Sequence, residues 1–476
     1  MTDLPAVGLQ TRRGPSGPAW LERTVTIAVR SVPGLRDWSA SERHVLAAKG
    51  SAWSLAGYGA SQVLRLATTL ILARQLLSPK AFGLVALANV FLSGLEVLSD
   101  IGTGMNVVQH LRGDDPGFLD TAFCMQACRG LALWVLAISL AFPFAAIYHQ
   151  PQVRMLVIVG ASTLAIRGVT SSSVWLMTRH VDLRKLTMLN VLGDGSGLVV
   201  TIAWAFASPT AWALVAGKVV TALAFTVGSH LFAERRVRAR WDRAAARDIL
   251  IFGTGMFLSS ATYFFSGESE RLVVGKFISI TELGCFSLAL VMASAPLGAL
   301  QRLISQVFFP MISETFRHNP RAAARHCRTL RLLLSGASII IGVGFLTCSG
   351  LAVRLLLRPE YAMTAWMLRL LGLRAALELF GSGAAVMLFA VGRSKYAAIG
   401  NTVKLAFLMG GLFLAFHYFG FRQAMWVLAA APLPHYLAQM VGLNKYVKPV
   451  VRTELACFAG FAVTVLVVAF FRRMLI

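Results

Sequence analysis

The chain has 476 residues, of which 57% are hydrophobic and only 14% are charged. Soluble domains carry roughly 25% charged residues, so this composition excludes an ordinary soluble protein and predicts one that crosses a membrane several times. A formal net charge of +24 would suit nucleic-acid binding, but the basic residues lie mostly in short loops between apolar runs, which argues against nucleic acid as the partner.

Residues 1–49 are polar and basic and lack the apolar core of a signal peptide, so we expect a disordered cytoplasmic tail. Apolar runs of about 20 residues, the length of a membrane-spanning helix, then follow one another along the chain. A thirteenth, shorter run at 455–471 predicts an additional C-terminal span. The twelve longer runs lie near residues 50–73, 83–109, 122–148, 154–178, 186–206, 210–232, 249–267, 282–307, 330–353, 363–391, 396–418 and 423–443.

The distribution of Lys and Arg orients these spans and divides them. Basic residues are concentrated in the loops on the side of the N-terminus, which predicts that this side is cytoplasmic. The most basic loop, residues 233–248, separates an N-terminal six-helix lobe (50–232) from a C-terminal six-helix lobe (249–443). Residues 444–476 then form a basic loop and the additional span.

A faint internal repeat favours two equivalent lobes. Residues 70–88 (LILARQLLSPKAFGLVALA) and 272–289 (LVVGKFISITELGCFSLA) both show an apolar run, a basic residue, a short polar turn, a glycine and a second apolar run. Internal duplication around a central site is a recurrent design in transporters.

Six basic residues lie inside the predicted spans, although a charge at bilayer depth costs roughly 3 kcal/mol or more. Such residues normally face a bundle interior or a wet cavity. The acidic residues at similar depth are fewer, namely Glu96, Asp100, Asp194 and Glu378. The imbalance predicts a positively charged cavity for an anionic substrate, lined by Arg65, Arg167, Lys218, Arg369, Arg374 and Lys404.

The carboxylates have two interpretations. Glu96 and Asp100 fall on one face of the second predicted span, where Arg65 of the first span is placed to pair with either of them. Arg374 and Glu378 are four residues apart and can bond each other. These contacts are either structural ion pairs, or Glu96, Asp100 and Glu378 bind a coupling proton or Na⁺.

The sequence carries no signature of an enzyme. The glycine-rich segment 193–197 lies in an apolar run without a preceding strand or a Lys-Ser/Thr pair, so it is not a phosphate-binding loop. We find no catalytic triad, metal-binding pattern or ATP-binding cassette. We therefore expect no enzymatic activity and no cofactor apart from a coupling ion, H⁺ or Na⁺.

Residues 46–110 contain the motif KGSAW at 49–53, the run LILARQLLSPKAFGLVALANVF and the motif SDIG at 99–102. These motifs give the chain a resemblance to the Wzx-like polysaccharide transporters, flippases of the multidrug/oligosaccharidyl-lipid/polysaccharide exporter superfamily. The resemblance continues in DTAF (120–123), RHVDLR (179–184) and AWALV (211–215), and it is strongest over residues 45–235. The long tail and the thirteenth segment depart from the family pattern.

The resemblance implies an all-α polytopic membrane bundle with two six-helix lobes around a central cavity, in the bacterial inner membrane. Such proteins move an undecaprenyl-diphosphate-linked oligosaccharide between leaflets by alternating access, for exopolysaccharide, capsule or lipopolysaccharide assembly. A polysaccharide polymerase and assembly proteins would be the protein partners. The implied diphosphate agrees with the excess of cations, because arginine binds phosphate groups through two parallel hydrogen bonds.

Two other functions stay open. A multidrug/cation antiporter of the same superfamily would favour an acidic, aromatic cavity. A non-transporting membrane scaffold of a glycan assembly complex would pair its buried charges entirely with each other and would lack a continuous cavity.

Overall fold

The computed structural model describes residue 59 and residues 61–474, with the exception of Val181, Glu234, Glu268, Asn319 and Val447. The predicted tail at 1–49 and the start of the first predicted span lie outside the described residues. Every regular element among the described residues is a helix, so the predicted all-α membrane bundle is confirmed.

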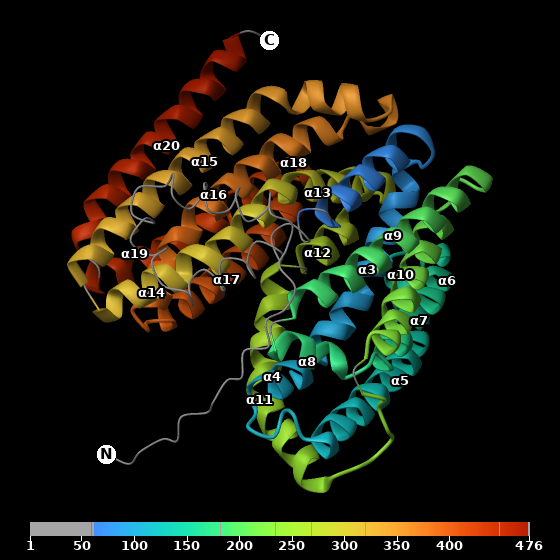
Figure 1. Ribbon diagram of the computed structural model, residues 1–476. Coiled ribbons are helices and arrows are strands. Elements are labelled where there is room, and N and C mark those ends of the chain that lie inside the picture. The colour runs from blue at the N-terminus through green and yellow to red at the C-terminus, as the bar shows by residue number, and fades with distance from the viewer. Residues whose placement is uncertain are drawn as a thin grey trace, which may run out of the picture. The chain divides into compact units, whose positions relative to one another are not determined.

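The first half of the chain (Figure 1) begins with a helix over residues 61–75 and continues through α10. These helices pack mainly on one another and form the N-terminal lobe. The helices that follow residue 75 are α3 (Pro79–Leu98), α4 (Thr103–Gln109), α5 (Pro116–Ile147), α6 (Pro151–Gly160), α7 (Ser162–Gly168), α8 (Ser173–Arg179), α9 (Leu183–Ala207) and α10 (Ala211–Leu231).

In the second half, α11 (Arg243–Gly267) contacts helices of both halves, and the helices after it form the C-terminal lobe. Helices α15, α16 and α20 run side by side in this lobe (Figure 1). The lobe contains α12 (Ser269–Phe277), α13 (Ile280–Leu303), a π-helical turn (Ile304–Phe308), α14 (Phe309–His318), α15 (Pro320–Leu356), a 3₁₀ turn (Pro359–Tyr361), α16 (Thr364–Ala390), α17 (Lys395–Tyr418), α18 (Phe421–Ala430), α19 (Pro432–Tyr446) and α20 (Lys448–Met474).

Each of the thirteen predicted segments overlaps a helix, but several helices are interrupted. Within the described residues, nine helices are long and apolar enough to cross a membrane, and a bent pair at 151–168 and 173–179 makes ten if it counts as one span. The predicted span at 423–443 is divided between α18 and α19. The molecule is therefore a multi-pass membrane protein whose spans are broken more often than hydropathy indicates.

The second predicted span, 83–109, is corrected in the same way. It consists of α3 and α4, separated by a turn in which Gly102 has a φ of +64° and donates its N–H to the Asp100 side chain at 3.0 Å. The left-handed backbone conformation costs glycine little, and an aspartate side chain readily accepts a hydrogen bond from the backbone of such a turn. Asp100 therefore does not share a helical face with Glu96.

The lobes meet at one end of the bundle, opposite the end that carries the basic loop 233–242. Here the start of α3 lies against the start of α13, and both helices begin after a serine that caps them, Ser78 and Ser279. A Cβ on Gly83 would lie 1.9 Å from the carbonyl oxygen of Ile280. The two backbones approach so closely that only glycine fits at this position.

The same contact recurs with the lobes exchanged, since a Cβ on Gly284 would lie 1.8 Å from the carbonyl oxygen of Pro79. Gly83 and Gly284 hold equivalent places in the repeat predicted from 70–88 and 272–289, as do the two capping serines. This reciprocal contact supports the duplication. We call it the glycine contact, meaning residues 79–83 and 280–284.

Two tyrosines reinforce the junction from outside the glycine contact. Tyr148, at the end of α5, donates its hydroxyl hydrogen to the Leu272 carbonyl at 3.0 Å. Tyr361, after α15, donates to the Leu77 carbonyl at 2.8 Å. Each hydrogen bond crosses from one lobe to the other, and a buried apolar core extends through both lobes around them. The bundle is thus closed at the end opposite the basic loop.

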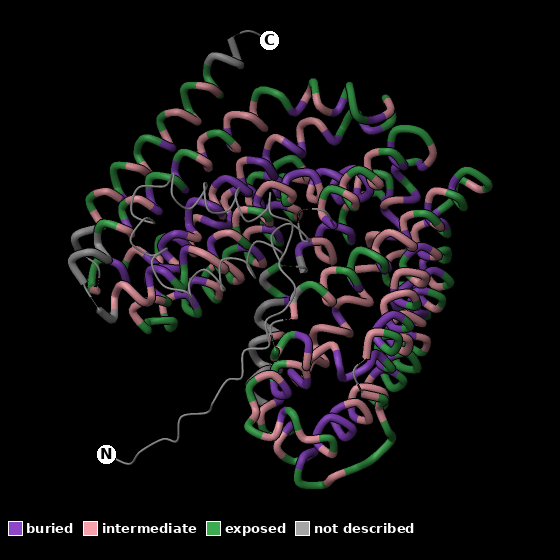
Figure 2. The backbone as a smooth tube through the Cα atoms, in the orientation of Figure 1, coloured by how far each residue is buried: buried purple, intermediate pink, exposed green. Residues whose placement is uncertain are grey.

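The predicted thirteenth span is present as α20, which lies at the periphery of the C-terminal lobe. Only 11% of its apolar window is buried inside the protein, against 61% for α16, and Figure 2 shows mainly exposed and partly exposed residues along it. A fully buried ion pair joins it to α15, with Arg331 Nε 2.8 Å from Glu454 Oε2. The Arg331 guanidinium also lies over the Phe380 ring, 3.4 Å from its centroid.

Candidate substrate cavity and ion-pair network

A cavity of about 670 Å³ lies between the lobes. Its wall is built mostly by the N-terminal lobe, from helix 61–75, α3, α6, α7, α9 and α10. The C-terminal lobe contributes residues of α12 and α13. The wall is largely apolar but carries several hydroxyl and amide side chains, namely Gln62, Thr68, Thr69, Asn89, Ser93, Thr163, Thr201, Thr221, Ser287 and Ser294.

Three of the six predicted cations line this cavity, Arg65, Arg167 and Lys218. A fourth cation on the wall, Arg271 of α12, was not predicted. Two carboxylates, Glu96 and Asp194, complete the charged lining. Among the described residues, the wall therefore carries two positive charges more than negative ones.

The predicted pairing of Arg65 with Glu96 or Asp100 is wrong for the described residues. Glu96 Oε1 lies 3.8 Å from Arg167 Nη1, and Asp100 Oδ1 lies 3.8 Å from Arg129 Nη1. Asp100 contacts Arg129 and not Arg65 because the break after α3 turns its carboxylate toward α5. Arg65 instead donates from Nε to the Ser61 carbonyl of its own helix at 3.4 Å.

Arg65 consequently has no ion-pair partner among the described carboxylates. Its side chain is exposed to the cavity rather than packed in a helix interface. Arg129 of α5, which was not among the predicted pairing residues, fills the structural role expected for Arg65. It donates to the Glu96 carbonyl and to Ser99 Oγ, and so ties the end of α3 to α5.

Arg374 and Lys404 lie in a separate network inside the C-terminal lobe. Arg374 Nη1 donates to Glu270 Oε2, and Arg374 Nη2 lies 3.6 Å from Glu378 Oε1, which confirms the predicted contact between Arg374 and Glu378. Lys404 Nζ donates to the same Glu378 oxygen at 2.8 Å. The network pairs two cations with two carboxylates and is therefore charge-balanced. Neither Arg374 nor Lys404 is among the cavity-lining residues.

Arg369, the remaining predicted cation, is in neither group. Its Nε donates to Ser349 Oγ at 3.2 Å, which links α16 to α15. The structure therefore brings together three of the six predicted cations and divides the rest between an ion-pair network and a helix contact.

Glu270 and Arg271 escaped the sequence analysis for one reason. The seventh predicted span ends at residue 267 because the next residues, Glu-Ser-Glu-Arg, are polar. In the structure the chain continues there as α12, which carries Glu270 into the lobe and Arg271 to the cavity. A basic residue next to an acid at a span edge is the signal that was available.

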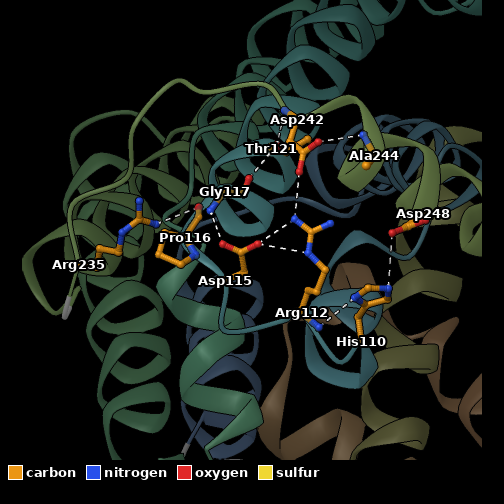
Figure 3. Close-up of polar contacts among 10 residues, drawn as sticks. All are labelled: His110, Arg112, Asp115, Pro116, Gly117, Thr121, Arg235, Asp242, Ala244 and Asp248. Atoms are coloured by element: carbon orange, nitrogen blue, oxygen red, sulfur yellow. Dashed lines mark hydrogen bonds and ion pairs between the residues drawn. The ribbon is translucent and has the colours of Figure 1, made fainter.

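At the basic end, the loop before α11 is fastened to the α4–α5 turn (Figure 3). Arg112 Nη2 donates to Asp115 Oδ2 at 2.8 Å and to Asp242 Oδ2 at 3.0 Å. Hydrogen bonds from Arg112, together with backbone N–H groups, hold the pKa of both Asp115 and Asp242 below its usual value. Arg235 extends the attachment to the buried Asp120, at 2.7 Å. We call this set of contacts the Arg112 clasp.

The first turns of α11 pack into the N-terminal lobe beside the clasp. Ala245, Ala246 and Ile249 share a buried cluster with Phe118 and Leu119 of α5. The start of α11, which was predicted to begin the C-terminal lobe at residue 249, is thus part of the N-terminal core.

The helix arrangement defines a class: this is a multi-pass membrane protein with the fold of solved transporters. A lipid II flippase, MurJ, in an inward closed conformation superposes with a TM-score of 0.65 and 12% identity, over 89% of this chain and 99% of that one. A multidrug resistance MATE family transporter of the MOP superfamily, in an inward-facing conformation, gives a TM-score of 0.62 at 14% identity, over 85% and 95%.

The chain belongs to the family of polysaccharide biosynthesis proteins, which it matches over residues 71–366. The family predicted from the sequence is thereby confirmed. The chain is also 23% identical, over 273 residues, to the succinoglycan biosynthesis transport protein ExoT of Rhizobium meliloti (strain 1021). That match covers 56% of this chain and 54% of the relative, so the chain spans about half the length of the curated relative it matches.

Proposed function

We propose that this protein is a flippase that moves a lipid-linked oligosaccharide with a diphosphate linkage, undecaprenyl diphosphate in bacteria, across the inner membrane for polysaccharide assembly. The observation that carries the proposal is the charge of the cavity, where four cations and two carboxylates are found among the described lining residues. A diphosphate esterified at both ends has two negative charges, which balances the excess. Arg65, with no described carboxylate beside it, is the strongest candidate to bind the phosphates.

The remainder of the wall suits a sugar. Hydroxyl and amide side chains can each donate and accept hydrogen bonds, as carbohydrate hydroxyls do. The volume of about 670 Å³ lies in the usual range for ligand pockets, roughly 300–1,000 Å³, and admits a head group. The prenyl chain would then lie outside the cavity, in the lipid.

The conformation supports alternating access with a cytoplasmic N-terminus. Basic loops face the cytoplasm in most membrane proteins, so the end that carries loop 233–242 would be the cytoplasmic one. The glycine contact closes the other end, which leaves the cavity to load from the cytoplasmic side. The two solved transporters named above are likewise in inward-facing or inward closed states. Release to the outer leaflet would require the glycine contact to open.

The coupling ion, H⁺ or Na⁺, would bind most readily at Glu96. This is the one predicted coupling carboxylate on the cavity wall, since Asp100 caps a turn and Glu378 is contacted by both Arg374 and Lys404. Removing charge from Glu378 would deprive the partly buried Lys404 of the carboxylate that it contacts, which is unfavourable.

The same observations weigh against the alternatives. A drug/cation antiporter would need an acidic cavity, whereas this one has a cationic excess. A scaffold would pair its charges completely, whereas Arg65 has no described ion-pair partner. Partner proteins such as a polysaccharide polymerase remain part of the proposal, to be sought once transport is established.

The test is complementation of a deletion strain with wild type, Arg65→Ala, Arg167→Ala or Arg422→Ala, with measurement of lipid-linked repeat units and surface polysaccharide. Arg422 is an exposed residue outside the cavity lining and serves as the control. We expect the deletion to abolish surface polysaccharide and to cause the lipid-linked intermediate to accumulate. Of the three variants, only Arg422→Ala should reverse both effects as the wild type does. Unchanged polysaccharide and intermediate in the deletion strain would refute the proposal.

A further inference from the structure

Helix α12 carries two adjacent residues of opposite charge to two different places. Glu270 is 3% exposed and points into the C-terminal lobe, where it bonds Arg374. Arg271, the next residue, lines the cavity. Consecutive residues of a helix point about 100° apart, so anchoring one on the lobe interior directs the other away from it.

The anchor for Glu270 is rigid because it is a network rather than a single pair. Arg374 is buried on α16 and also contacts Glu378, which in turn accepts a hydrogen bond from Lys404 of α17 at 2.8 Å. Three helices, α12, α16 and α17, therefore fix the position of the Glu270 carboxylate.

Helix α12, which carries both Glu270 and Arg271, is nine residues long. It also lies between the lobes, in contact with α3 on one side and with α13 and α17 on the other (Figure 1). A side chain that faces the cavity from this helix is placed only as well as the helix itself is held.

Among the described cavity residues of the C-terminal lobe, Arg271 is the charged one, since the others are Ser287, Leu288, Val291 and Ser294. Arg65, Arg167 and Lys218 all come from the N-terminal lobe. An anion bound by this set is therefore held from both lobes, and its binding is linked to their arrangement.

We propose that Arg271 is a substrate-binding residue for the phosphate groups, and that Glu270 and Arg374 are positioning residues that aim it into the cavity. The inference rests on the proposed function and adds to it a specific contact from the C-terminal lobe. It assigns the buried network a role in anion affinity that a purely structural ion pair would not have.

The experiment measures binding of farnesyl diphosphate, with farnesyl monophosphate for comparison, to the purified full chain in lipid nanodiscs. We expect Arg271→Ala to weaken diphosphate binding roughly tenfold to a hundredfold, the loss of one or two charge-assisted hydrogen bonds. Glu270→Gln should weaken it to a similar extent, whereas Glu270→Asp, which keeps the charge, should recover much of the affinity. Arg422→Ala is the matched control.

A double-mutant cycle separates positioning from general damage. If Glu270 acts through Arg271, then Glu270→Gln has no further effect once Arg271 is alanine, but its effect multiplies with that of Arg65→Ala. Arg374→Lys, which keeps the buried charge and loses the planar fork, should follow Glu270→Gln in both backgrounds and serves if that variant does not fold.

The outcomes distinguish the inference from the function on which it rests. If Glu270→Gln and Arg271→Ala multiply, or if Arg271→Ala leaves affinity unchanged, the positioning role is overturned while diphosphate binding by the wild type still supports a flippase. If the wild type shows no preference for the diphosphate over the monophosphate, the proposed function fails and the inference fails with it.

Discussion

Replacing a glycine of the glycine contact should shift the protein toward a state that is open at that end. In the closed state, a methyl at residue 83 would lie 1.9 Å from the Ile280 oxygen, and one at residue 284 would lie 1.8 Å from the Pro79 oxygen. Ordinary contact begins at 3.4 Å, so α3 and α13 would have to separate by about 1.5 Å. The obstacle is backbone on both sides, which cannot rotate away as a side chain can.

The size of the shift follows from the cost of overpacking. Inserting a methyl into a tightly packed contact costs about 1–3 kcal/mol, and here the cost falls only on the closed state. The ratio of open to closed molecules should therefore rise roughly 5- to 150-fold in Gly83→Ala or Gly284→Ala. The double variant should shift little further, because a separation that relieves one contact also relieves the other.

Electron-paramagnetic-resonance distances give the measurement. Spin labels at His149→Cys and Phe419→Cys, both exposed near the closed end, report the separation of the lobes in a background without the native cysteines. Gly195→Ala is the control, since its added methyl meets no atom within 4 Å. If Gly83→Ala and Gly195→Ala gave the same distance distribution as the wild type, the glycine contact would not be the closure of this end.

Two further predictions concern stability and pH. Arg331→Met should destabilise the protein by about 3–5 kcal/mol, seen as a lower melting temperature, because it leaves the buried Glu454 carboxyl without its ion-pair partner. Arg331→Met with Glu454→Leu should recover most of the loss, and a double variant no more stable than the single one would refute this account. The Arg112 clasp should protect loop 233–242 from trypsin above about pH 4 and lose that protection as the pH falls further, since the pKa of Asp115 and Asp242 is lowered in the folded state and protonation there breaks their bonds to Arg112. Because trypsin is inactive at low pH, cleavage by pepsin measures the exposure of the loop there. Arg112→Gln should already expose the loop to trypsin at pH 7.

Most of the helical layout could be predicted from the sequence because long apolar runs in a membrane protein leave few alternatives to a helix. The breaks were harder. The Asp100–Gly102 turn carries a recognisable signal, an acid two residues before a glycine, but Asp100 also fits the spacing of the polar face of α3. Local spacing alone does not decide between these interpretations.

The charged partners could be predicted less well, because hydropathy reports depth and not direction. Arg65 and Arg374 are both cations inside apolar helices, yet one faces a cavity and the other a carboxylate of α12. That difference depends on which helices are neighbours. The sequence predicts a cavity with an excess of cations. It does not predict that Arg271 lines this cavity, because that depends on a short helix whose composition is typical of a loop.

The two lobes preserve their similarity where they meet and lose it where the substrate would bind. Closing one end between duplicated lobes requires the same close backbone approach from each side, which explains why a capping serine and a glycine occur in both copies, at 78 and 83 and at 279 and 284. A single substrate imposes no such symmetry. The N-terminal lobe accordingly carries an excess of cavity cations, whereas the C-terminal lobe balances its buried network two against two and extends one arginine, Arg271, toward the cavity. An anion binding there would contact both lobes, although the N-terminal lobe provides most of the site. The contact that links binding to movement of the C-terminal lobe would therefore be the one from α12.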